Sequence, residues 1–299
     1  MNLMRYRGLL FIFLWLLSLT TSSFAANILY PLYSYPNWWN QDAYIWDDIA
    51  AAGSTCDITA IINPSNGPGG DDSPNEDYIQ GLQDLANGNI KIIGYVPTGY
   101  GQRNIEDVEA DISKYQRDFA GPGYTVSGIF LDEVSTSEDS TTLNYYENIS
   151  NFIMDESANP NLDTVVMNHG TRAPAEYLSM ADINVIFEGN LDDWNSVEGE
   201  LGSYFPEKTA ILVYGVDNVD DMEAIIDRAI QLNITDVFIT DDAGSNPWDS
   251  LPSYWTQEVE YVASASPVPL PTSIQLLVVG LVLLMLNRVN VKRGFSVLS

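Results

Sequence analysis

Short apolar runs rich in β-branched residues alternate with longer stretches of helical periodicity along most of this chain. The apolar runs occupy residues 28–33, 58–63, 90–96, 126–131, 164–168, 183–187, 209–214 and 234–240. The helical stretches occupy residues 41–52, 75–86, 103–119, 141–157, 175–180, 192–204, 219–232 and 253–263. Strands that are apolar on both faces and alternate with helices are typical of parallel sheets. Eight such units predict an α/β fold, a single (β/α)8 TIM barrel over residues 26–263, with an open doubly wound sheet as the alternative.

The N-terminal end, residues 1–25, has the pattern of an export signal. Two arginines precede an apolar run over residues 9–17, and Ser23-Phe24-Ala25 has the small residues that signal peptidase accepts. We therefore expect a secretory signal peptide that signal peptidase cleaves after Ala25. An N-terminal membrane anchor is the alternative, but the apolar run is shorter than the ~20 residues that a membrane span requires.

The C-terminal end, residues 267–299, begins with a proline-rich motif, continues with an apolar run over 274–286 and closes with a basic tail. This order resembles the PEP-CTERM sorting signal of Gram-negative bacteria that produce exopolysaccharide. The resemblance implies transient retention in the inner membrane, basic side inward, and removal by an exosortase. A permanent C-terminal anchor is the alternative. Both predict that the mature region lies outside the cytoplasm, as a secreted, cell-surface or matrix protein.

The charge balance argues against several classes of partner. The chain has 12 Lys and Arg against 41 Asp and Glu, and the two ends contain basic residues but no acidic ones. The region between the ends is therefore even more acidic than the whole-chain net charge of −29. Such a field repels phosphates, so a nucleic-acid partner is not expected. A cationic partner would be attracted, and acidic surface that serves only solubility is the alternative.

Cysteine and histidine are too scarce for a disulfide or a transition-metal site. Cys56 is the only cysteine, so no internal disulfide can form, and its place before an apolar run predicts a buried structural thiol. His169 is the only histidine, so no zinc or iron site and no cofactor are expected. The pairs Asp71-Asp72 and Asp241-Asp242 lack the ligand spacing of a calcium loop.

Active sites of (β/α)8 barrels lie at the C-terminal ends of the strands, so the residues that close each strand are the candidates. Most of these positions hold acids, amides or tyrosines. In chain order they are Tyr33, Asn63, Tyr95, Asp132 with Glu133, Asn168 with His169, Glu188, Tyr214 and Asp241. Tyr100 follows the third strand and is, with Tyr33, our first candidate for a ring that stacks on a sugar.

Three acids among these candidates point to a specific chemistry. Asp132 and Glu133 end the apolar run of "GIFLDE", and Glu188 ends that of "VIFE" in the same way. Two carboxylates across a cleft can hydrolyse a glycosidic bond, because one protonates the leaving oxygen and the other attacks carbon or activates water. Since successive strand residues point to opposite faces, Asp132 and Glu133 cannot both face the barrel axis unless the strand kinks. The period does not say which of them does.

Five stretches together resemble the spherulin-4-like glycoside hydrolases in order and spacing. They are AIINPSNGPG (60–69), IIGYVPTGYG (92–101), GIFLDEV (128–134), NHGTRAPAEYLSMAD (168–182) and VIFEG (185–189). The resemblance implies a (β/α)8 barrel that cleaves α-1,4-linked N-acetylgalactosamine, or its deacetylated cationic form, inside a biofilm polysaccharide. It also implies that Asp132 is the nucleophile and Glu188 the acid/base, with Glu133 beside them. A non-catalytic polysaccharide-binding or matrix protein on the same barrel is the alternative.

Overall fold

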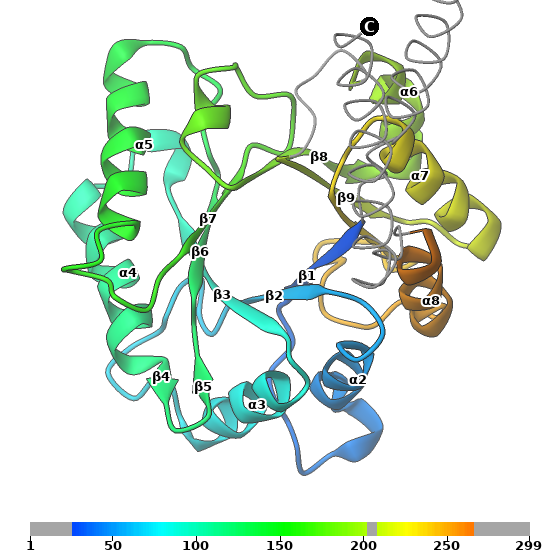
Figure 1. The fold of residues 1–299 in the computed structure, drawn as a ribbon, viewed down its shortest axis with the longest axis horizontal. Coiled ribbons are helices and arrows are strands. Elements are labelled where there is room, and N and C mark those ends of the chain that lie inside the picture. The colour runs from blue at the N-terminus through cyan, green and yellow to red at the C-terminus, as the bar shows by residue number, and fades with distance from the viewer. Residues whose placement is uncertain (1–25, 202–207, 266–299) are drawn as a thin grey trace, which may run out of the picture. The chain divides into compact units, whose positions relative to one another are not determined.

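The structure, a computed structural model that describes residues 26–201 and 208–265, is a closed eight-stranded parallel barrel surrounded by helices (Figure 1). The strands follow the order β1-β10-β9-β8-β7-β6-β3-β2 around the ring. Their bounds are β1 (Asn27–Leu32), β2 (Ile58–Ile62), β3 (Lys91–Pro97), β6 (Gly128–Asp132), β7 (Thr164–Asn168), β8 (Ile183–Asn190), β9 (Thr209–Tyr214) and β10 (Asp236–Ile239). The predicted TIM barrel is confirmed, and the open sheet is excluded because β1 pairs with both β2 and β10.

Helices cover the outside of the barrel, so each strand is buried on both faces. The seven α-helices of the described residues are α2 (Ile45–Ala52), α3 (Glu76–Asn87), α4 (Ile105–Asp118), α5 (Ser140–Ile153), α6 (Leu191–Leu201), α7 (Val219–Gln231) and α8 (Trp255–Ala265). Polar caps begin three of them: the side chains of Asn75, Asp139 and Asn218 accept backbone N–H groups at the starts of α3, α5 and α7. None of the described helices is long and apolar enough to span a membrane.

The structure corrects the sequence prediction in three places. The helix expected over 175–180 is instead a short 3₁₀ turn, η3 (Tyr177–Ser179), and successive i→i+3 bonds such as Met180 N to Tyr177 O hold it. The stretch 41–52 divides at Tyr44 into η1 (Gln41–Ala43) and α2. A small antiparallel hairpin, β4 (Ala120–Gly121) and β5 (Tyr124–Thr125), precedes β6 and was not expected. The export signals predicted over 1–25 and 267–299 lie outside the described residues.

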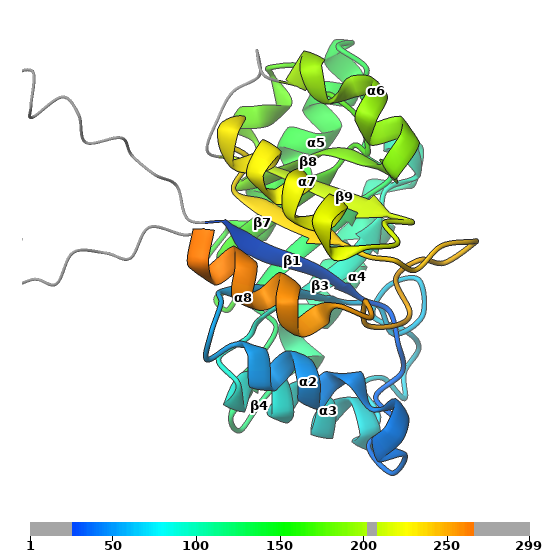
Figure 2. The ribbon, with the colours of Figure 1, turned by 90° about the vertical axis from the view of Figure 1, so that its right-hand side faces the viewer.

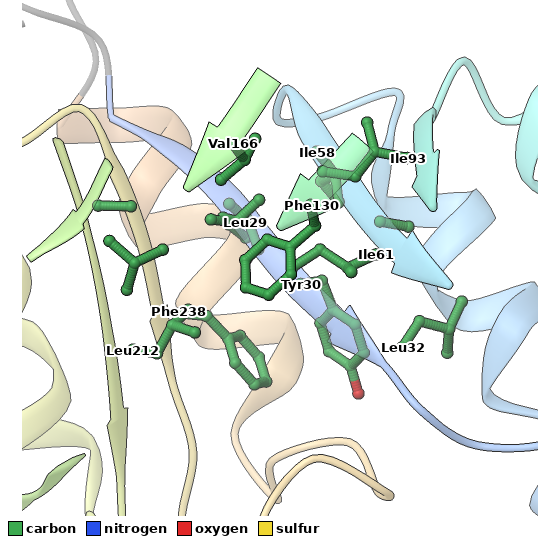
Figure 3. Close-up of a cluster of buried hydrophobic side chains, with 14 of the residues drawn as sticks. Leu29, Tyr30, Leu32, Ile58, Ile61, Ile93, Phe130, Val166, Leu212 and Phe238 are labelled. Atoms are coloured by element: carbon green, nitrogen blue, oxygen red, sulfur yellow. The ribbon is translucent and has the colours of Figure 1, made fainter. Parts of the chain in front are cut away.

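Strand register shows which side chains face the barrel interior. Phe130 on β6 pairs with Tyr95 on β3 and with Val166 on β7, so these three share one face of the sheet. The same alternation, followed around the ring, places Leu29, Ile61, Ile93 and Leu212 on that face as well. Phe130 lies among these buried side chains in Figure 3. The interior of the barrel is therefore a packed apolar core that supports the residues at the C-terminal ends of the strands.

Cys56 lies at the edge of this core, as predicted. Its side chain is buried, and burial raises the pKa of its thiol to about 12, with the carboxylate of Asp57 adding to the effect. A thiol with such a pKa is protonated at neutral pH and is a poor nucleophile. Cys56 therefore acts as a small packing residue.

Candidate active site

The inward-facing positions at the C-terminal ends of the strands form one polar layer above the apolar core. Strand alternation assigns to this layer Tyr33, Asn63, Tyr95, Asp132, Asn168 and Tyr214, each of which lies two residues beyond an inward-facing position. All six are among the residues selected from the sequence. The barrel thus brings together groups that are up to 181 residues apart in the chain because its strands share one register.

Asp132 is held from both sides by this layer. The hydroxyl of Tyr95 donates a hydrogen bond to its Oδ2 at 2.6 Å, and Nδ2 of Asn168 donates one to its Oδ1 at 2.7 Å. Both donors lie on neighbouring strands, β3 and β7, so the barrel framework fixes the orientation of the carboxylate. Asp132 is therefore presented as an oriented carboxylate at the barrel mouth.

Asn168 joins Asp132 to Glu188. The same Nδ2 that contacts Asp132 also donates to Oε2 of Glu188 at 2.6 Å, while its Oδ1 accepts the backbone N–H of Gly170 at 2.9 Å. Since both bonds share one nitrogen, the two carboxylate oxygens lie within about 5.3 Å of each other. The side chain of Asn168, fixed by Gly170, thus sets the spacing of the two acids.

A β-bulge turns Glu188 into the barrel. Asn168 pairs with Val185 across β7 and β8, so strict alternation would next place Phe187 inside and Glu188 outside. The register between β8 and β9 shifts between Val185 and Phe187, and Glu188 then pairs with the inward-facing Leu212. Phe187 turns outward instead and packs edge-to-face on Trp194 of α6, with ring centroids 5.4 Å apart. Bulges that re-aim a side chain are common next to active sites.

The environment of Glu188 favours its protonated form. Burial raises the pKa of the Glu188 carboxyl, and the nearby charge of Asp132 raises it further, while hydrogen bonds from Asn168 and Trp248 act in the opposite direction. A carboxyl with a raised pKa retains a proton that it can donate to a leaving group. The pair thus contains one carboxyl held by two hydrogen bonds and one carboxyl whose pKa is raised.

Glu133 lies outside the inward-facing layer. β6 ends at Asp132, and Glu133 adopts a left-handed backbone conformation with φ of 53°, which is rare for a non-glycine residue. The backbone thus kinks directly after β6, but the kink does not bring both carboxylates to the axis. The Glu133 side chain is exposed, so Asp132 is the member of the pair that faces the axis.

Thr98, which the sequence analysis did not select, supports this kink. Its buried hydroxyl is 2.9 Å from the Asp132 carbonyl, 2.8 Å from the Glu133 carbonyl and 2.9 Å from the hydroxyl of Tyr146. The backbone N–H of Tyr100 also donates to the Glu133 carbonyl, at 2.7 Å. Strained backbone persists where surrounding bonds over-determine it. The only sequence signal was a polar residue directly after β3, and Tyr146 gave none because it lies within a helix.

Aromatic side chains flank the two acids. Tyr33 packs edge-to-face on Tyr95 with ring centroids 5.6 Å apart, and burial together with the charges of Asp132 and Glu188 raises the pKa of its phenol. On the other side Tyr214 packs on Trp248 at 5.9 Å. Tyr100 is 61% exposed and its backbone is left-handed, so its ring projects into solvent at the mouth. A sugar placed between the acids would meet apolar ring surface on both sides.

Two selected residues lie near the site but have bonds to the protein itself. Oδ1 of Asn63 accepts the backbone N–H of Gly67 at 3.0 Å and so shapes the loop after β2. Oδ1 of Asp241 accepts the backbone N–H of Ser253 at 3.0 Å, just before α8. For both residues these bonds indicate a part in loop structure, and contact with a substrate stays a prediction.

The ring of His169 is also engaged by the protein. Nδ1 lies 3.2 Å from the Ser135 carbonyl and Nε2 lies 3.3 Å from the amide of Asn184, while Tyr177 packs edge-to-face on the ring. Burial lowers the pKa of His169 to about 4, so the ring is neutral at pH 7 and Nδ1 carries the proton toward the carbonyl. Nε2 is then a hydrogen-bond acceptor. It can accept from Nδ2 of Asn184, which is otherwise without a partner among the described residues, if the amide oxygen and nitrogen of Asn184 exchange places. This arrangement indicates a structural role behind the mouth.

Metal ligation has no support from the geometry of the described part. Within residues 26–201 and 208–265, no group of three or more His, Cys, Asp and Glu side chains is arranged to hold a metal ion.

We expect Asn168→Ala to lower kcat by about 10²-fold, because the acids lose the group that spaces them and small misplacements are costly in catalysis. The lost hydrogen bond normally lowers the pKa of Glu188, so that pKa should rise. The alkaline limb of the pH–rate profile, which reports loss of the acid's proton, should therefore move to higher pH. Steady-state kinetics across pH measure both effects. A variant with a stable fold and an unchanged profile would show that Asn168 does not control the pair.

Comparisons with known proteins agree with this architecture. Residues 27–262 match the family model described as Spherulation-specific family 4. Spherulin-4 of Physarum polycephalum is 32% identical over 254 residues, which cover 81% of this chain and 71% of that protein. The crystal structure of Aspergillus clavatus Sph3 in complex with GalNAc superimposes with a TM-score of 0.72 at 23% identity, covering 81% of this chain and 98% of that one. The chain thus belongs to the spherulation-specific family 4.

Proposed function

We propose that this protein is an endo-acting glycoside hydrolase that cleaves α-1,4-linked galactosamine or N-acetylgalactosamine within an exopolysaccharide. The observation that carries the proposal is the pair Asp132 and Glu188, which a single amide nitrogen of Asn168 holds at 2.7 and 2.6 Å. The Sph3 structure, which shares the fold, contains GalNAc and supports the choice of sugar. The family resemblance noted in the sequence supports the linkage.

The spacing of the two acids favours a retaining mechanism. Retaining glycosidases place their carboxyl groups ~5 to 5.5 Å apart, whereas inverting enzymes leave ~6.5 to 9.5 Å for a water molecule. The shared donor on Asn168 limits the nearest oxygens to about 5.3 Å, which fits the shorter spacing. In an α-linked N-acetylgalactosamine the 2-acetamido group lies cis to the leaving oxygen and cannot attack from the far side. In a retaining mechanism the protein must therefore supply the nucleophile.

In the proposed reaction Asp132 attacks the anomeric carbon while Glu188 donates its proton to the leaving glycosidic oxygen. The bond between the anomeric carbon and the glycosidic oxygen breaks. The released part of the polysaccharide leaves with a new hydroxyl, and a glycosyl ester on Asp132 remains. Glu188, now ionised, then takes a proton from water, which attacks the same carbon and frees Asp132. Tyr95 and Asn168, both bonded to Asp132, hold the nucleophile in line during both steps.

The test is to incubate the purified protein with galactosaminogalactan and with its fully deacetylated form. Mass spectrometry should show short hexosamine oligomers from at least one of them, and proton NMR should show α-configured reducing ends first. β-configured first products would refute the retaining mechanism. Binding without any product would favour the alternative, a matrix protein on the same barrel.

Export is part of the same proposal. A signal peptide over residues 1–25 and a sorting signal over 267–299 would bring the barrel to the cell surface or the surrounding matrix, where an exported polysaccharide is found. Recovery of the hydrolase from cell-surface or medium fractions of the producing bacterium, with an N-terminus at Ala26, supports it. Recovery of the uncleaved chain from the cytoplasm contradicts it.

A further inference from the structure

A second aromatic cluster lies on the rim of the barrel, away from the two acids. The exposed large hydrophobic side chains of the described residues are Tyr35, Trp38, Trp39, Tyr100 and Met154. Three of them, Tyr35, Trp38 and Trp39, occupy the loop between β1 and η1, and Trp39 is 58% exposed. Exposed apolar surface gathered in one place commonly marks a binding site. In Figure 2 this blue segment lies at the end of the barrel toward which the β1 arrow points.

Hydrogen bonds with residues at the start of α3 fix two of these exposed rings, Tyr35 and Trp38, in place. The Tyr35 hydroxyl donates to Oδ2 of Asp77 at 2.6 Å, and Nε1 of Trp38 donates to Oδ1 of the same carboxylate at 2.9 Å. Nδ2 of Asn75, the N-cap of α3, donates to the Tyr35 hydroxyl at 2.8 Å. Rings that are already ordered lose little conformational entropy when a ligand binds. The cluster is thus pre-organised although it faces solvent.

The rings contact one another, and one of them, Tyr35, also lines a neighbouring hollow. Trp39 packs on Trp38 and on Tyr35, with ring centroids 5.9 and 6.2 Å apart, and Tyr35 packs edge-to-face on Tyr78 at 5.5 Å. A cavity of about 300 Å³ lies between Tyr35, Tyr78 and the loop after β2. That volume is at the lower end of the range for small-molecule sites. The lining of the cavity includes none of the residues around Asp132 and Glu188.

The walls of this hollow carry two carboxylates, and the ammonium of Lys114 contacts the same lining at the Ser73 carbonyl, 3.0 Å away. Asp71 and Asp72 line it, and no described basic residue forms an ion pair with either of them. Carboxylates attract a cation, and the faces of Trp and Tyr rings attract one as well through their quadrupole. A ligand with an apolar ring face and an ammonium group would satisfy both features. A neutral sugar would gain from the rings alone.

The position of the hollow suits a sugar unit some distance along a polysaccharide that is cleaved between Asp132 and Glu188. The loops after β1 and β2 lie at the same end of the barrel as the carboxylates. Tyr33, two residues before Tyr35, contacts Tyr95, and Tyr95 contacts Asp132. Aromatic residues therefore lead from the acids toward the rim. An extended polymer bound at the centre could follow them outward.

We propose that Tyr35, Trp38 and Trp39, together with Asp71 and Asp72, form a second sugar-binding site, the rim site, that holds ammonium-bearing amino-sugar units of the polymer. The identity of the polymer rests on the proposed function. The rim site makes the protein prefer stretches of polysaccharide in which a deacetylated unit lies several sugar units away from the bond that is cleaved.

The experiment measures binding by calorimetry in the full chain with Glu188→Gln as background, so that no ligand is consumed. The probes are α-1,4-linked galactosamine oligomers and N-acetylgalactosamine oligomers of equal length. Trp39→Ala should weaken binding of the cationic oligomer about tenfold. Asp71→Asn combined with Asp72→Asn should remove most of the preference for the cationic oligomer, and raised salt should have the same effect in the parent. Tyr124→Ala, on the hairpin at the opposite end of the barrel, and Glu147→Gln, on the exposed face of α5, are the controls and should bind like the parent.

Equal affinity of Trp39→Ala and its parent, or no preference for the cationic oligomer, would overturn the rim site. Thermal unfolding of each variant checks the fold, which should be unaffected because Trp39 is mostly exposed. Loss of binding in Trp39→Ala supports the rim site even if the wild-type protein releases no products, an outcome that would refute only the hydrolase proposal. Hydrolysis of long polymer by Trp39→Ala with the wild-type KM would overturn only the rim site.

Discussion

Glu188→Gln is expected to reduce polysaccharide cleavage by about 10²- to 10⁴-fold, because that is what a positioned general acid contributes and Gln carries no acidic proton. Gln keeps an oxygen that can accept from Asn168, so the geometry of the site should survive. The burial that raises the pKa of Glu188 also makes its charged form costly, so the variant should unfold at the same temperature or higher. Product analysis and thermal unfolding on the same preparation measure both effects.

Asp132→Asn should be as inactive, because the amide cannot form the glycosyl ester. Glu133→Gln is the matched comparison: it changes the neighbouring carboxylate, which is exposed and lies outside the inward-facing layer. This variant should keep much more activity than Asp132→Asn. Full activity in Glu188→Gln or Asp132→Asn would refute the assignment, and a Glu133→Gln variant as inactive as Asp132→Asn would show that Glu133 is the reacting member of the pair.

The second large effect concerns Glu258, whose carboxyl is buried where the barrel closes. β1 and β10 are paired only through Asn27 and Ile28, and beyond that point Oε1 of Glu258 accepts the backbone N–H of Ile239 at 2.9 Å. Its other oxygen, Oε2, is buried without a partner among the described residues. Burial raises the pKa of Glu258 to about 8, opposed by the Ile239 N–H and aided by the charge of Asp241.

A raised pKa makes the folded state less stable as the pH rises. The unfolded chain releases this proton near its ordinary pKa of about 4.3, whereas the folded protein retains it until about pH 8. Below about pH 4.3 Glu258 is protonated in both states and costs no stability for this reason. Between the unfolded and folded pKa values the free energy of unfolding falls by up to about 1.4 kcal/mol per pH unit. The total loss from this group is on the order of 5 kcal/mol at pH 8 and above.

Glu258→Gln should remove this dependence. The variant should be less stable than wild type at pH 5, by about 1 to 3 kcal/mol, because the new amide N–H₂ is buried without a partner. At pH 8 it should be as stable or more stable. Urea unfolding at the two pH values, with the exposed Glu147→Gln as control, measures the difference. If Glu258→Gln and wild type lost the same stability between pH 5 and pH 8, Glu258 would not be the buried acid that titrates.

The sequence predicted those residues of the candidate site that lie directly at the end of a strand. An acid that terminates an apolar run is visible in the chain itself, and both Asp132 and Glu188 were selected on that ground. Asn168 was selected by the same criterion, but its bridging of the two acids depends on the pairing of β6, β7 and β8. Thr98 and Tyr146 were missed because their role is to bond backbone atoms of a kink that has no sequence pattern.

By itself the sequence determined the alternation of strands and helices and the collection of acids, amides and tyrosines at the strand ends. These properties depend on neighbouring residues, because periodicity and burial act over a few positions of the chain. Only the tertiary structure decided which side chains face the axis. The bulge before Phe187 turns Glu188 inward, and the left-handed Glu133 separates it from Asp132. The physical reason is that the strand register around the closed barrel decides whether a side chain points inward or outward. That register depends on the packing of strands that are distant in sequence.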